Sequence, residues 1–286
     1  MTAALLLVLK LSIVAMIFAI GLGSTPADFG YLWRRPALLL RSLLAMYVAV
    51  PVAALLAVKL LVLPLPVKAA ILVLAISAGA PLLPRKLVLL GRESYVFSLV
   101  VTSSLLAIVA VPAWLVVLGP LFGRESAVEP GVVALVIAKA FFAPLVLGML
   151  ARWPLSRVAG RLSEVILKGT SALLLVAALL LLAKHARLLV EIGWIPLAAL
   201  AGLTAVALVI GHTLGGPAPD DRTALAVVCA TRHIGIAMLA ASAVPGPRTI
   251  ALVLAYLVAS AAVSIPYIRW RARPARAAGP ARLPEP

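Results

Sequence analysis

Charged side chains are scarce in this sequence of 286 residues, and acidic ones are the scarcest. Asp and Glu together number nine against 25 Lys and Arg, and charged residues make up only 12% of the chain, whereas soluble domains carry roughly 25%. Cysteine occurs once, at Cys229, which excludes an intrachain disulfide. Hydrophobic residues make up 64% of the chain. This composition excludes an ordinary soluble domain and indicates an integral membrane protein.

Long apolar runs recur along the whole chain. A helix needs roughly 20 apolar residues to cross the hydrocarbon core, and turn-forming and charged clusters divide the chain into nine such segments. The sequence therefore predicts an all-α integral membrane protein with nine transmembrane spans. Cleavage of the first span as a signal peptide is the alternative, which Lys10 inside that span disfavours. The predicted spans are residues 3–22, 37–62, 67–91, 94–118, 131–151, 168–184, 193–213, 222–244 and 248–268.

Lys and Arg are distributed unevenly between the predicted loops. With the N-terminus outside, the inner loops and the C-terminus collect most of them, as the positive-inside rule requires. We expect an N-terminus outside and a C-terminus in the cytoplasm, in a plasma (inner) membrane of bacterial type. One membrane domain is expected over residues 1–270, with halves of about 1–120 and 130–270, followed by a disordered basic tail over 271–286. Without aromatic interleaving, this charge predicts contact with the lipid bilayer and not with nucleic acid.

Two spans contain features that interrupt a helix at membrane depth. The stretch "ISAGAPLLPRK" places Gly79, Pro81 and Pro84 inside the third span, and proline removes a helical hydrogen bond. The stretch "CATRHIGIAM" places Gly235 beside charged residues in the eighth. One interrupted span in each half is typical of transporters built from inverted repeats. The alternative is that the prolines only kink a tilted helix.

Several longer stretches resemble a known family in the order in which they occur. They are "IFAIGLGSTPADFGYLWRRPALLLRSLLAMYVAVPVAALL" (17–56), "LAISAGAPLLPRKLVLLGRESYVFSLVVTSS" (74–104), "VIAKAFFAPLVLGML" (136–150) and "DRTALAVVCATRHIGIAMLAASAVPG" (221–246). On these residues the chain resembles the bile acid:sodium symporter family. The resemblance implies core and panel domains with two crossing discontinuous helices, nine spans because the usual first helix is absent, and alternating-access transport of an amphipathic or small organic anion.

The chain departs from that family at its cation ligands. Sodium-coupled members carry a glutamate and a Gln-Asn pair in the second crossover, where this chain aligns Val228 or Cys229 and the pair Arg232 and His233. The acidic residues of this chain all lie in predicted loops, at span ends or in the tail. Because a hard cation such as Na⁺ prefers oxygen ligands, we predict transport without sodium.

A charged side chain at the depth of Arg232 is costly, between roughly 2.5 and above 10 kcal/mol, so it must find a partner. A guanidinium binds a carboxylate, sulfonate or phosphate through two parallel hydrogen bonds. Arg232 and Arg85 could bind one anion between them in this way across the crossing, as a clamp. The alternative partners are backbone carbonyls at the end of a half-helix.

Further polar residues complete the predicted substrate site. His233 is the candidate for proton coupling, since histidine titrates near neutrality with an unperturbed pKa of about 6.5; the alternative is a neutral packing residue. Ser77, Thr231 and the hydroxyls of Thr102, Ser103 and Ser104 are candidate substrate ligands, although such residues commonly bond within membrane helices.

Three functions remain open from the sequence. The first is a secondary transporter of a small organic anion that is sodium-independent or proton-linked. The second is a sodium-coupled symporter of the bile acid type, and the third is a non-transporting membrane sensor or structural module with the same fold. The absence of paired acids, a nucleophile motif and metal-ligand clusters argues against an enzyme, a metal site and a cofactor. The oligomeric state is left open.

Overall fold

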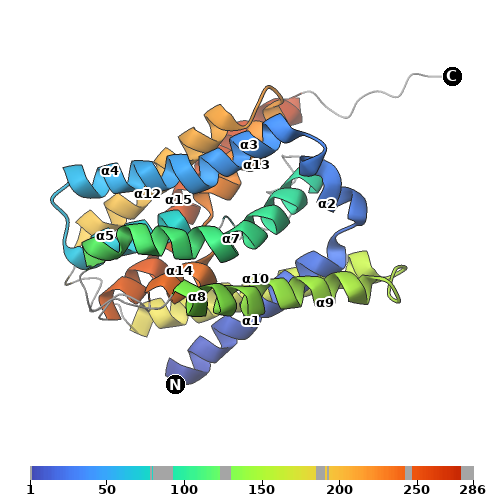
Figure 1. The fold of residues 1–286 in the computed structure, drawn as a ribbon, viewed down its shortest axis with the longest axis horizontal. Helices are drawn as coiled ribbons and strands as arrows, with labels where there is room; N and C mark the ends of the chain where they lie inside the picture. The colour runs from blue at the N-terminus through green and yellow to red at the C-terminus, as the bar shows by residue number, and fades with distance from the viewer. Residues whose placement is uncertain are drawn as a thin grey trace.

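The chain is helical throughout the parts that the computed structural model describes, which are residues 2–77, 79, 93–122, 130–184, 191, 193–241 and 247–277. Most helices run along the long axis of the molecule (Figure 1). Within these ranges no β-strand is formed. The elements are α1 (Thr2–Gly23), α2 (Pro26–Trp33), α3 (Pro36–Leu44), the π-helical turn η1 (Ala45–Ala49), α4 (Val50–Leu60), α5 (Leu65–Ile76), α7 (Glu93–Phe122), α8 (Pro130–Ile137), the π-helical turn η2 (Ala138–Phe142), α9 (Ala143–Arg152), α10 (Ala159–Lys184), α12 (Trp194–Leu214), α13 (Pro219–Ala230), α14 (Ile234–Ala241) and α15 (Pro247–Ala277).

Six continuous helical segments are long and apolar enough to cross a membrane, and two shorter apolar helices accompany them, Leu7–Gly23 and Leu65–Ile76. This confirms an all-α membrane protein among the described residues, while the count of nine spans remains a prediction. The six segments are Pro36–Leu60, Ser94–Leu121, Gly131–Arg152, Ala159–Lys184, Trp194–Leu214 and Arg248–Ala272.

Several helices extend beyond the apolar runs that predicted them. α10 begins at Ala159, nine residues before the predicted start of its span, because its polar first turns are stabilised by protein contacts. Ser163 is buried there and donates a hydrogen bond to the backbone oxygen of Ala19 at 2.7 Å. α15 continues to Ala277, so the first seven residues of the predicted disordered tail are helical. The short helix α2 was not expected at all.

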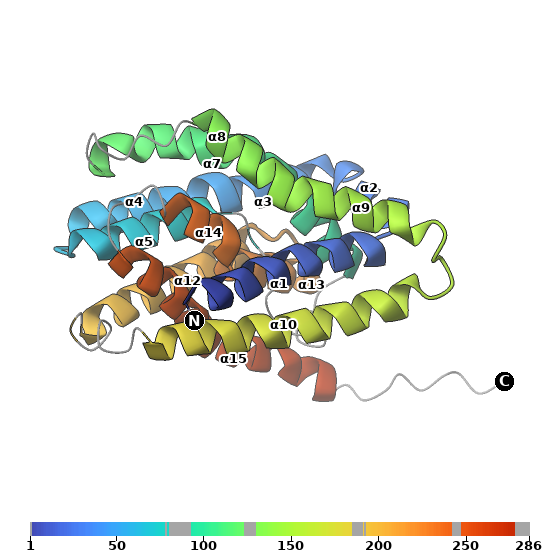
Figure 2. The same ribbon diagram turned by 90° about the horizontal axis from the view of Figure 1, so that it is seen from below.

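The helices pack in two groups. α1 lies against α9 and α10. These helices form the lower side of the molecule in Figure 1 and face the viewer in Figure 2. In the other group, α12 packs against α13 and α15, and α5 packs against α4 and α15. α14 contacts α5 and α15 and also contacts α8, which leads through η2 into α9 of the first group. α14 therefore forms part of the junction between the two groups.

The contact between α1 and α9 depends on a close approach of two backbones. A Cβ atom added at Gly148 would lie 2.1 Å from the backbone oxygen of Phe18, and small residues are what permit such helix crossings in membranes. At the end of the same contact, Nη1 of Arg152 donates hydrogen bonds to the backbone oxygens of Leu22 and Gly23, each at 3.1 Å. A cation at a helix C-terminus is favourable, so Arg152 fixes the end of α1.

Candidate functional site

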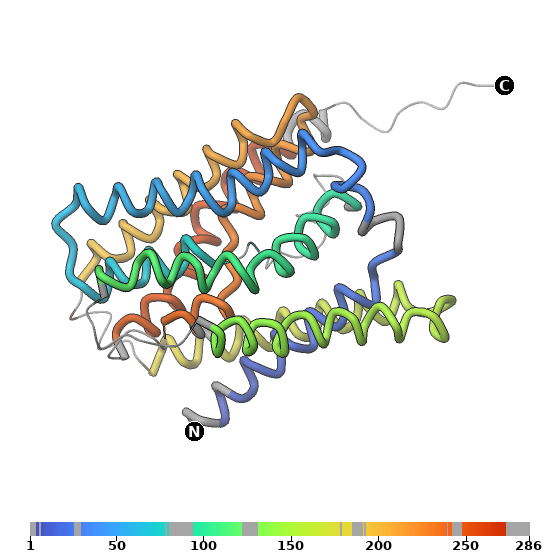
Figure 3. Tube along the Cα trace, in the orientation of Figure 1, coloured from blue at the N-terminus to red at the C-terminus, as the bar shows by residue number. Residues whose placement is uncertain are grey.

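The helix in the eighth predicted span is interrupted although it contains no proline. α13 ends at Ala230, Thr231 is extended (φ −96°, ψ 99°), and α14 begins at Ile234. The trace passes from α13 in the upper half of the view to α14 in the lower half (Figures 1 and 3). Gly235, which the sequence placed in the interruption, lies in the first turn of α14 because the backbone already leaves the helix at Thr231.

The helix in the third predicted span also ends inside the protein, beside this interruption. α5 ends at Ile76, and Ser77 is extended (φ −67°, ψ 151°). The backbones of Gly79 and Arg232 then pair as an isolated antiparallel bridge. A Cβ atom at Gly79 would lie 2.5 Å from the backbone oxygen of Val228, so only glycine permits this approach. The two extended segments therefore meet backbone to backbone.

Arg232 lies at this meeting point with a fully buried side chain, 0% exposed. Its Nη1 atom donates to the backbone oxygen of Ser77 at 3.0 Å and makes a longer contact with that of Met46 at 3.5 Å. Its Nε and Nη2 atoms donate to no acceptor among the residues that the structure describes. These two atoms form one edge of the planar guanidinium, and such an edge pairs bidentately with a carboxylate or a similar oxyanion.

The acceptor oxygen of Met46 is available because of a proline one turn later. Pro51 has no N–H, so it can donate neither to the oxygen of Tyr47 in an α-helical register nor to that of Met46 in the π-helical register of η1. Nε1 of Trp114 donates to the oxygen of Tyr47 at 2.9 Å instead. Sequence reasoning missed Met46 and Tyr47 as site residues, and Pro51 inside a span was the signal that could have pointed to them.

Two tyrosine hydroxyls bind backbone oxygens next to the site. Tyr47 donates to the backbone oxygen of Ser103, and Tyr256 donates to that of Ala230, the last residue of α13. Both rings are buried. Because a helix end leaves its last carbonyl groups without backbone donors, the Tyr256 hydroxyl stabilises the interruption, and Tyr47 connects η1 to α7. Neither tyrosine was identified from the sequence.

His233 is buried on the side of the interruption that faces the other group of helices. Its ring meets the ring of Phe141, in η2, edge to face with centroids 4.4 Å apart. A Cβ atom added at Gly235 would lie 2.9 Å from the tip of Ile13, in α1, and 3.4 Å from Nδ1 of His233. That nitrogen has no hydrogen-bond partner within the described ranges. His233 therefore lies at the junction of the two helix groups.

The predicted hydroxyl ligands bond mostly within their own helices. Thr231 donates to the backbone oxygen of Val227 at 2.7 Å, Ser77 donates to that of Leu74 at 2.7 Å, and Ser103 donates to that of Val100 at 3.1 Å. The structure therefore brings Ser77 to Arg232 through its backbone oxygen and not through its hydroxyl.

Thr102 and Ser104 are both buried, and Oγ1 of Thr102 has no partner in the described part of the chain. Arg85, Pro81 and Pro84 lie outside the described residues. The clamp of Arg232 with Arg85 therefore remains a prediction, as does the role of the two prolines.

Carboxylates are remote from Arg232 along its own helix. Asp221 is buried in the first turn of α13, and the helix from there to its last residue, Ala230, has a length of roughly 14 Å at a rise of about 1.5 Å per residue. The described residues contain no group of three or more His, Cys, Asp or Glu side chains that could hold a metal ion. Among the described residues, the atoms that accept hydrogen bonds from the Arg232 guanidinium are backbone oxygens.

A sequence profile described as the sodium bile acid symporter family matches residues 10–192 of the chain. No curated protein matches the chain. The matched range includes α5 and the contacts of α1 with α9 and α10, and it ends before α12. Arg232 and His233 lie beyond it, so their roles are inferred from their surroundings.

Proposed function

We propose that this chain, which belongs to the sodium bile acid symporter family, moves a small organic anion by alternating access without sodium. The family was predicted from the resemblance, and it identifies the chain as a membrane transporter. The proposal is supported above all by the unpartnered edge of the Arg232 guanidinium. A buried charge with unused donors costs several kcal/mol. An oxyanion on Nε and Nη2 would supply the missing acceptors.

Independence from sodium is supported by the cation that already occupies the crossing, the guanidinium of Arg232. Backbone oxygens such as those of Ser77 and Met46 are the hard ligands that a metal cation would use, and here they accept hydrogen bonds from Arg232. The guanidinium is a permanent cation on the chain itself, placed at the end of α5 where a helix terminus favours positive charge. A second cation at the same oxygens would meet like-charge repulsion.

The proposed movement takes place between the two helix groups. We assign α1, α8, α9 and α10 to the panel and the helices around the crossing to the core, with nine spans in all and the C-terminus in the cytoplasm. His233 meets Phe141 across this boundary, so an anion on Arg232 would lie close to the surface along which the groups slide. Alternating access then exposes the same anion site to either side in turn.

Replacement of sodium by choline tests the coupling. In proteoliposomes that contain the purified chain, we expect the initial rate of anion uptake to change by less than about twofold, because Arg232 supplies the charge that a coupled cation would otherwise bring. The rate is measured with radiolabelled carboxylates, sulfonates and steroid conjugates in matched sodium and choline buffers. Strict dependence on sodium would overturn the coupling assignment and favour a sodium-driven symporter of the same fold.

His233→Asn tests the proposed proton link. Asparagine keeps a polar group of similar size but does not titrate between pH 5 and 8, so we expect the pH profile of uptake to become flat while some transport remains. Phe141→Leu serves as the control, since it removes the ring that packs on His233 and leaves the imidazole in place. A profile in the His233→Asn variant identical to that of the native chain would assign the coupling to another group.

A further inference from the structure

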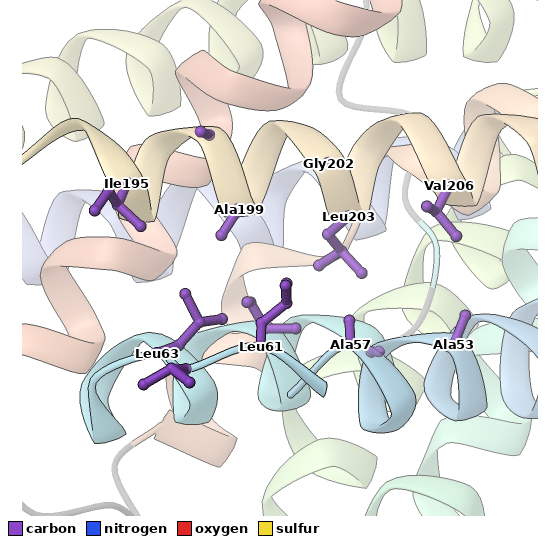
Figure 4. A pocket seen from close by; sticks show the side chains of 13 residues that line it. Ala53, Ala57, Leu61, Leu63, Ile195, Ala199, Gly202, Leu203 and Val206 are labelled. Atoms are coloured by element: carbon purple, nitrogen blue, oxygen red, sulfur yellow. The ribbon is translucent and has the colours of Figure 1, made fainter. Parts of the chain in front are cut away.

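An apolar groove runs between α4 and α12, on a part of the core that takes no part in the crossing. Ala53 and Ala57 line it from α4, Ala199, Gly202 and Val206 line it from α12, and the two rows face each other across the gap (Figure 4). Its volume is about 480 Å³. All thirteen residues that line the groove are apolar or glycine, so their side chains offer no hydrogen bond to a ligand.

The groove has the length of one leaflet. From Ile195 to Val206 the lining follows α12 for eleven residue steps, which is about 16 Å at a rise of about 1.5 Å per residue. Half of the hydrocarbon core of a bilayer measures about 15 Å. The groove therefore matches the depth of a single layer of acyl chains.

One end of the groove is expected at the membrane surface, because α12, which is long and apolar enough to cross a membrane, begins there. The turn between α4 and α5 and the first residue of α12 are found there, and Trp194 in that position is 76% exposed, as expected of an aromatic residue at the interface. Lys59 in the last turn of α4 and Lys68 in the first turn of α5 lie at the same end, with Glu191 the one described carboxylate close to it in sequence. The charge at this end favours a phosphate headgroup.

We propose that the groove binds one acyl chain of a phospholipid whose headgroup lies at the turn between α4 and α5. The match in length, the wholly apolar lining and the cationic end all fit this occupant. The lipid fills the space between α4 and α12 and keeps these core helices in fixed relative positions while the panel moves. This site is independent of the anion site at Arg232.

Gly202→Leu tests the proposal by filling the groove from α12. A Cβ atom at Gly202 meets nothing within 4 Å, so a leucine side chain can leave the backbone without a clash and extend into the groove. Gly169→Leu is the matched control, because that glycine lies within the exposed surface of α10 and its Cβ atom also meets nothing within 4 Å. The chain is purified from palmitoyl-oleoyl phosphatidylglycerol vesicles, and retained lipid is counted by native mass spectrometry.

We expect the native chain and the Gly169→Leu variant to retain one phospholipid per chain, and the Gly202→Leu variant to retain at least about tenfold less. Ala57→Leu, which fills the groove from α4, should behave like Gly202→Leu and replaces it if that variant does not fold. Equal retention by all variants would overturn the proposal. So would a native dimer that Gly202→Leu converts to a monomer, since the groove would then be covered by a second copy of the chain.

Discussion

Arg232→Gln is expected to lower the affinity for the transported anion at least about 30-fold, because removal of one partner from a buried, hydrogen-bonded charge pair costs about 2–5 kcal/mol and each 1.4 kcal/mol is tenfold in affinity. Glutamine has neither the positive charge nor the edge formed by Nε and Nη2. The affinity is measured by thermal shift, first with a panel of carboxylates, sulfonates and steroid conjugates on the native chain, and then with the anion that stabilises it most.

The same variant should still fold. Without ligand the arginine is a buried charge whose hydrogen bonds are incomplete among the described residues, and replacing such a charge is often neutral for stability. Arg232→Lys is the control, since it keeps the charge but loses the planar fork, and an intermediate affinity is expected. An Arg232→Gln variant that binds the anion as tightly as the native chain would remove Arg232 from the site.

Gly79→Ala is expected to disrupt the crossing itself. The added Cβ atom would lie 2.5 Å from the backbone oxygen of Val228 and 2.8 Å from the tip of Met46, and a backbone atom cannot move aside as a side chain can. Overpacking of this kind costs about 1–3 kcal/mol. We expect a lower melting temperature, and we expect anion uptake in proteoliposomes to be lost because the bridge to Arg232 is pushed apart.

Gly235→Ala is the matched control for that change. It lies in the first turn of α14, three residues after Arg232, and its Cβ atom would meet the flexible tip of Ile13 at 2.9 Å. That side chain can rotate, so melting temperature and uptake should stay close to those of the native chain. If Gly79→Ala were tolerated as well as Gly235→Ala, the close approach of Gly79 to α13 would not be needed for function.

The helical class could be predicted from the sequence because apolar runs of about 20 residues are long enough to cross a bilayer as helices and rarely occur in soluble domains. Arg232 could be located for the same reason, since one charge stands out in an apolar run. The start of α10 was misplaced, because apolar runs mark only the hydrocarbon section, and polar turns stabilised by contacts such as that of Ser163 with Ala19 lie beyond it.

The partners of Arg232 could not be predicted from sequence patterns. Met46 lies 186 residues away, and its oxygen is an acceptor because of the π-helical turn before Pro51, which apolar periodicity does not reveal. The hydroxyls of Ser77 and Thr231 looked like ligands by position, yet each bonds within its own helix, as serine and threonine commonly do in membranes. The groove between α4 and α12 arises only from packing and has no motif.

The central claim is that Arg232, at the crossing, binds an anion that the protein transports through the membrane. Flux of radiolabelled anions into proteoliposomes tests this claim most directly. In sodium-free buffer, the native chain should take up at least one carboxylate, sulfonate or steroid conjugate well above protein-free vesicles, and Arg232→Gln should reduce that uptake to the protein-free level. Equal uptake by the native chain and protein-free vesicles for every anion, in sodium-free and sodium buffers alike, would contradict transport and leave a non-transporting membrane module of the same fold.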